Sequence, residues 1–96
     1  MENVTESTTE LIIKVCDELK NMLLEKNMMY GDSVHQTGPL FDVDPIFGIQ
    51  SRINDKLRRI QNSGITPDTE DSIADLIGYL VHLKIAMYKK KGTPIF

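Results

Sequence analysis

Charged side chains recur along one side of a predicted helix in the middle of the chain. Arg52, Asp55, Lys56 and Arg59 follow one another at helical spacing, so all four project from the same side. A guanidinium binds phosphate oxygens through two parallel hydrogen bonds, and an ammonium adds a point charge. The same spacing is typical of a solvated helix face whose charges pair with one another, which needs no ligand. Both interpretations stay open at this point.

Polar and aromatic residues also gather where the first amphipathic pattern stops, at Gly31. A glycine that closes a helix explains this stretch in the simplest way. Charged and aromatic groups at such a junction are also common in ligand sites, and a tyrosine ring can stack on a base. We therefore predict a nucleotide site made from the cationic side of the middle helix, the residues around Gly31 and a tyrosine further on, namely Lys26, Asn27, Tyr30, Asp32, Ser33, Arg52, Asp55, Lys56, Arg59 and Tyr79.

Two carboxylates one helical turn apart, Asp71 and Asp75, could share Mg²⁺, which prefers oxygen ligands. They could equally accept hydrogen bonds from the cationic residues of the middle helix. Mg²⁺ is the one cofactor that these residues suggest. The sequence contains no glycine-rich phosphate loop, Ser-His-Asp arrangement or zinc-binding pattern, and His35 and His82 are expected to be incidental.

Capping residues predict three helices. The first begins at the capping box Ser7-Thr8-Thr9-Glu10 and ends near Met28 or Met29, before Gly31. The second begins at Asp44-Pro45 and ends at Asn62-Ser63-Gly64, and the third runs from near Thr66-Pro67-Asp68 to Lys90 or Lys91, before Gly92. The fold class is therefore all-α, a small bundle of three main helices.

Apolar residues at helical spacing predict which faces are buried. The expected stripe of the second helix is Ile46, Ile49, Ile53, Leu57 and Ile60, and that of the third is Ile73, Leu76, Ile77, Leu80, Leu83 and Met87. Opposite the second of these stripes lie Asp71, Asp75, Tyr79 and His82, beside Gly78. Because a glycine inside a helix costs about 1 kcal/mol relative to alanine, we expect another helix or a ligand to approach closely there.

Size and composition limit the remaining possibilities. A chain of 96 residues predicts a single helical domain, with a flexible stretch at 1–6, a long functional loop at 31–44 and a tail at 92–96. Such a short domain is marginally stable alone, so a homo-oligomer is expected. The net charge of −3 disfavours duplex nucleic acid as a partner. The sequence lacks a membrane-spanning segment or a signal peptide, which predicts a cytoplasmic protein.

The order of these residues resembles the nucleotide-modification-associated domain 1 family of phages and bacteria. The resemblance covers residues 25–88 and rests on three blocks: Lys26-Asn27 with Tyr30-Gly31-Asp32-Ser33, Arg52-Ile53-Asn54-Asp55-Lys56-Leu57 with Arg59, and Asp71 with Asp75-Leu76-Ile77-Gly78-Tyr79. The chain is also distantly similar to the MazG-like all-α nucleotide pyrophosphatases, which are helical oligomers that hold magnesium with acidic residues.

The chain departs from the MazG-like pattern at the first acidic element. Those enzymes carry a Glu-Glu-x-x-Glu run, whereas the corresponding helix here has separated acids such as Asp17, Glu18 and Glu25. Without that cluster the usual magnesium ions cannot be assembled, and water activation loses its base. The resemblance therefore implies a small phage-type, non-catalytic protein that binds or sequesters a nucleotide or cyclic nucleotide signal in the host cytoplasm, as an anti-defence sponge. The alternative is a Mg²⁺-dependent nucleoside triphosphate pyrophosphatase.

Overall fold

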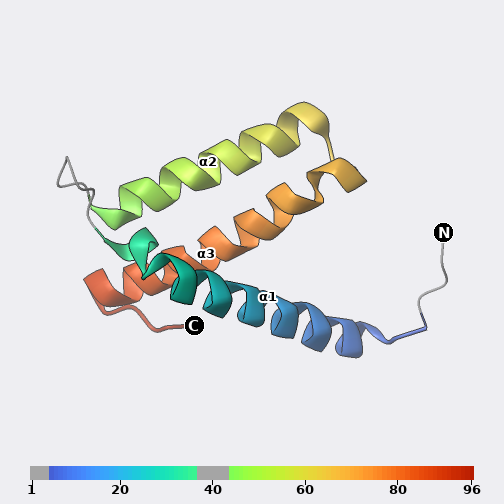
Figure 1. Cartoon of the computed structure of the whole chain (residues 1–96), viewed down its shortest axis with the longest axis horizontal. Helices are drawn as coiled ribbons and strands as arrows, with labels where there is room; N and C mark the ends of the chain where they lie inside the picture. Colours follow the sequence, from blue (N-terminus) through green and yellow to red (C-terminus); the bar gives the residue numbers. More distant parts are fainter. Residues whose placement is uncertain (1–4, 37–43) are drawn as a thin grey trace. The chain divides into compact units, whose positions relative to one another are not determined.

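The computed structural model describes residues 5–36 and 44–96, and over these residues the chain is all-helical. Three α-helices, α1 (Thr8–Tyr30), α2 (Pro45–Ser63) and α3 (Glu70–Lys91), are joined by two short 3₁₀ helices, η1 (Ser33–His35) and η2 (Pro67–Thr69) (Figure 1). No strand occurs in these two ranges. The predicted all-α class with three main helices is confirmed. The expectations for residues 1–4 and for the middle of the 31–44 loop fall outside the described residues.

The chain divides into two compact units, Met1–Gly31 and Asp32–Phe96, and each is described here by itself. The prediction of one helical domain stays a prediction. The first unit consists of α1. Its start and end follow the local chemistry, because the Ser7 hydroxyl accepts a hydrogen bond from the Glu10 N–H (3.1 Å) and Gly31 closes the helix in the left-handed region.

In the second unit α2 and α3 lie side by side and run in opposite directions (Figure 1). Asp44 caps α2 by accepting a hydrogen bond from the Ile46 N–H (2.9 Å), and Pro45 occupies the first turn. The turn between the helices is fixed by Thr69, whose buried hydroxyl accepts from the Thr66 N–H and donates to the Thr66 carbonyl. The third helix therefore starts one 3₁₀ turn later than its capping residues predict.

Gly64 adopts φ 74° and ψ −177°, a combination that side-chain-bearing residues hardly populate. We expect Gly64→Ala to lower the free energy of unfolding by roughly 1–3 kcal/mol, although an added Cβ would meet no atom within 4 Å. Gly48→Ala is the matched control, since Gly48 has equally open surroundings but lies inside α2. It should stabilise the protein by about 0.5–1 kcal/mol. Urea denaturation measures both; equal effects of the two substitutions would contradict the backbone argument.

The face of α3 that meets α2 is its polar and small-residue side. Gly78 and Ala86 are buried, and Ile49 of α2 is the one large side chain of the described residues with under 2% exposure. The predicted apolar stripe of α3 is partly covered, since Ile77 and Leu80 are 36% and 45% exposed whereas its other members, Ile73, Leu76, Leu83 and Met87, are half-buried. The prediction of this stripe is therefore partly correct, while the contacts of α3 with Lys56 and Arg52 of α2 come from Asp75 and Tyr79 on its polar side.

The apolar stripe of α2 is partly correct. Ile49 is buried and Ile46, Ile53 and Ile60 are half-buried, whereas Leu57 is exposed on the outer side. Beyond α3, the tail residue Phe96 is almost fully exposed, with the Lys84 ammonium 4.7 Å from the centre of its ring. Among the described helices, none combines the length and apolar character required to cross a bilayer.

Candidate functional site

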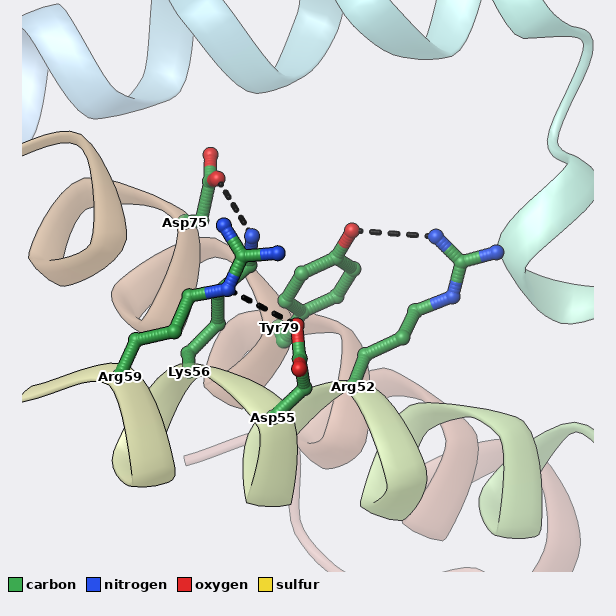
Figure 2. A network of polar contacts seen from close by, with 6 residues as sticks. All are labelled: Arg52, Asp55, Lys56, Arg59, Asp75 and Tyr79. Carbon is green, nitrogen blue, oxygen red and sulfur yellow. Dashed lines mark hydrogen bonds and ion pairs between the residues drawn. The ribbon is translucent and has the colours of Figure 1, made fainter. Parts of the chain in front are cut away.

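Six charged and polar residues meet along one edge of the α2–α3 pair, and we call this group the polar seam. Its members are Arg52, Asp55, Lys56 and Arg59 from α2, and Asp75 and Tyr79 from α3 (Figure 2). The α2 residues project toward the side on which Asp75 and Tyr79 lie, as their spacing predicted. The seam therefore joins two of the three predicted sequence blocks.

At one end of the seam, Arg52 and Tyr79 are in direct contact. An Arg52 Nη donates a hydrogen bond to the Tyr79 hydroxyl over 3.1 Å, and the guanidinium carbon lies 5.6 Å from the centre of the ring. The second distance is within the range of a cation–π interaction. The contact holds the arginine beside an aromatic face, which is an arrangement that also accommodates a base and its phosphate.

Lys56 is the least accessible of the four seam residues that come from α2. Its ammonium lies 3.2 Å from a carboxylate oxygen of Asp75, and only 16% of its side chain is exposed. An ion pair at this depth is better shielded from solvent than a surface pair, so it helps to fix the register of α2 against α3. The pairing of a cationic residue with Asp75 corresponds to the second of the two interpretations given for this carboxylate.

At the other end of the seam, Arg59 pairs with Asp55 within α2. The Nε atom lies 3.4 Å from a carboxylate oxygen, and both side chains are more than half exposed. Such an exposed pair one helical turn apart contributes only about 0.3–0.5 kcal/mol. A stronger anionic partner can therefore compete for Arg59 at small cost.

The second predicted metal ligand, Asp71, is exposed in the first turn of α3, where its negative charge is favourable near the helix N-terminus. Within residues 5–36 and 44–96, no three His, Cys, Asp or Glu side chains are grouped so that they could hold a metal ion. The Mg²⁺ site at Asp71 and Asp75 stays a prediction.

The remaining predicted site residues lie before η1 or in it. Lys26, Asn27 and Tyr30 occupy the last two turns of α1 in the first unit, and all three are exposed. Asp32 and Ser33 belong to the second unit and begin η1. The Asp32 carboxylate lies 4.0 Å from the Lys89 ammonium at the end of α3. The proposal that the α1 residues share a ligand with the polar seam stays a prediction.

Two histidines form a contact that the sequence did not predict. His35 Nε2 of η1 lies 2.9 Å from His82 Nδ1 of α3, and the two rings are tilted by 59°. Burial lowers the pKa of His35, with a further lowering by Lys89 that Asp32 partly opposes. Burial also lowers the pKa of His82, and the neighbouring His35 lowers it further. The pair ties η1 to α3, and no local sequence signal could reveal a contact between residues 47 positions apart.

This pair makes stability dependent on pH. Because the pKa of each imidazole is lower in the folded protein than its ordinary value near 6.5, the unfolded chain takes up protons more readily. We expect the free energy of unfolding to be constant above about pH 7.5 and to fall as the pH drops below about 6.5. Urea denaturation at several pH values measures it. His82→Gln should flatten this dependence between pH 7 and 5.5, and an unchanged slope in that variant would refute the assignment.

Comparison with protein-family models, curated proteins and solved structures finds no match to this chain.

Proposed function

We propose that this protein binds a nucleotide or cyclic nucleotide without turning it over, with the phosphate groups on the polar seam. The observation that carries the proposal is the position of two guanidinium groups, those of Arg52 and Arg59, on the side of α2 that faces Tyr79. A guanidinium has five N–H donors. One bond to the Tyr79 hydroxyl and one ion pair with Asp55 leave most of these donors for phosphate oxygens.

The ring of Tyr79 supports a nucleotide over a simple inorganic anion. Tyr79 is half-buried, so part of its side chain is accessible to a ligand. Stacking of a base on an aromatic side chain contributes about 1–3 kcal/mol and tolerates different bases. The Lys56–Asp75 ion pair holds the helices beneath this surface, so the ligand would meet groups that are already in position.

The biological role follows from binding without catalysis. The resemblance to the nucleotide-modification-associated domain 1 family points to phages, and a small binder present in many copies lowers the free concentration of a host signal by affinity alone. We propose that the protein acts as such a sponge. Both carboxylates of the seam pair with cationic side chains, Asp75 with Lys56 and Asp55 with Arg59, an arrangement suited to holding a ligand.

We also propose that the protein assembles with copies of itself. The described residues leave large apolar side chains exposed on both units: Ile12, Ile13, Val15 and Leu24 on α1 are each more than 50% exposed, and Ile77 and Leu80 form part of a stripe on α3. Exposed apolar surface of this extent is typical of interaction sites. A further copy could cover it and increase the stability of a small chain.

Calorimetric titration and thermal shift with a panel of nucleotides test the proposal. The panel includes mono-, di- and triphosphates, cyclic mononucleotides and cyclic dinucleotides, with native mass spectrometry reporting the oligomer and any retained ligand. A ligand at about 100 times its Kd should stabilise the fold by roughly 2.7 kcal/mol. The absence of heat and of thermal shift across the panel would refute the binding proposal, and release of pyrophosphate in the presence of Mg²⁺ would favour the enzymatic alternative.

A further inference from the structure

A concave site lies at the end of the helix pair where α2 begins and α3 ends. Its volume is about 470 Å³, which is within the range of small-molecule sites. It shares no residue with the polar seam, and its lining comes from η1, the start of α2 and the end of α3: His35, Asp44, Pro45, Ile46, Ala86, Lys89 and Lys90. All of these belong to the second unit.

The cavity has an apolar part and a charged part. Pro45, Ile46 and Ala86 are buried or half-buried, so they offer a surface for an aliphatic or aromatic group. Lys89 and Lys90 bring two ammonium groups from the last turn of α3. Pockets that combine an apolar lining with a few convergent polar groups are the usual form of a small-molecule site.

The two ammonium groups differ in how firmly they are held. Lys90 is bonded to the Asp44 carboxylate, which also caps α2. Lys89 lies 4.0 Å from Asp32, at the limit of an ion pair, and about half of each of these side chains is exposed. A pair of this kind contributes little, so Lys89 can turn to another anion at small cost.

Positive charge exceeds negative charge around the cavity. Lys91 adds a third cation next to the two that line it, and its field helps to lower the pKa of Asp44. Asp32 and Asp44 are the carboxylates that the described contacts place beside these lysines. The wall also contains His35, whose ring nitrogen is hydrogen-bonded to His82 and whose pKa is lowered, mainly by burial.

We propose that this cavity binds a small organic anion, with a phosphate or carboxylate group on Lys89 and Lys90 and an apolar group on Ile46 and Ala86. The site is independent of the nucleotide site proposed on the polar seam. It therefore gives the protein a second ligand of a different class: a compact molecule with one anionic end and one apolar end.

Phenyl phosphate, benzoate, inorganic phosphate and phenol serve as probes, with binding followed by backbone amide chemical shifts of the full-length protein. Phenyl phosphate or benzoate should saturate shifts at residues of the cavity, and inorganic phosphate and phenol should each bind at least several-fold more weakly. Lys89→Gln should weaken phenyl phosphate binding about tenfold. Lys91→Gln is the matched control, because it removes the same charge two residues further on, from a side chain that does not line the cavity.

Three results of this experiment would contradict the proposal or part of it. No saturating shift with either organic anion would overturn the proposal, as would an equal loss in Lys89→Gln and Lys91→Gln, since that pattern indicates only general charge attraction. Equal binding of inorganic phosphate and phenyl phosphate would overturn the role of the apolar surface. Because the chemical shifts are read residue by residue, binding at this cavity and binding at the polar seam are followed separately, so failure of the nucleotide site and failure of this site are distinguishable.

Discussion

Replacing Arg52 and Arg59 together by alanine is expected to weaken nucleotide binding about a hundredfold or more. Each guanidinium would lose charge-assisted hydrogen bonds to phosphate, and a bond to a charged group contributes roughly 1.5–3 kcal/mol. Both side chains are exposed, so the fold should survive the change. Calorimetric titration with the nucleotide that binds most tightly in the panel measures the loss.

Arg58→Ala is the control for this experiment. Arg58 is an exposed arginine of the same helix, one residue before Arg59, so it points to a different side of α2. It should retain nearly full affinity. If Arg58→Ala weakened binding as much as the double variant, the positive charge of α2 as a whole would be responsible and the polar seam would lose its special role. Arg52→Lys separates geometry from charge, because lysine cannot form the two parallel bonds of a guanidinium.

Ile49→Ala is expected to cause the largest loss of stability among single substitutions in the helix pair. The Ile49 side chain is 1% exposed, and truncating a buried isoleucine to alanine costs about 2–5 kcal/mol through lost burial and the cavity left behind. In a domain of this size each kcal/mol lowers Tm by roughly 4–8 °C. Thermal denaturation at fixed protein concentration should show a decrease of about 10 °C or more.

The matched control is Ile65→Ala, which makes the same chemical change at a side chain that is 84% exposed. Its effect should stay within about 0.5 kcal/mol. Equal destabilisation by the two substitutions would mean that Ile65 is covered in the assembled protein and that Ile49 is not the centre of the core. Dilution would then identify the cause, because stability that depends on a partner copy varies with concentration.

The limits of the helices could be predicted because their signals are local. A serine or aspartate cap followed by helical residues, and a glycine in the left-handed or extended positive-φ region after them, act through bonds within a few positions. Ser7, Asp44, Gly31, Gly64 and Gly92 all perform these roles in the structure. The additional 3₁₀ turn before α3 was not predicted, because it depends on the reciprocal bonds of Thr66 and Thr69.

The choice of contacting faces could not be predicted in the same way. The sequence indicated that the side of α3 with Asp75, Gly78 and His82 is not simply solvated, and this side does carry the contacts with α2 and η1. Apolar spacing nevertheless favoured the side with Leu80 as core. Periodicity identifies stripes on a helix but not which neighbour each stripe meets, and a helix with two usable faces leaves that choice to long-range packing.

The closeness of α2 and α3 has a consequence for how any nucleotide could enter or leave. Gly78 and Ala86 are buried on α3, and residues this small let neighbouring helices pack closely. A nucleotide held by Arg52 and Tyr79 would lie along the edge of the pair where these two side chains meet. Only a second surface laid over that edge would slow its escape, so the residence time of the ligand would depend on assembly as well as on the two arginines.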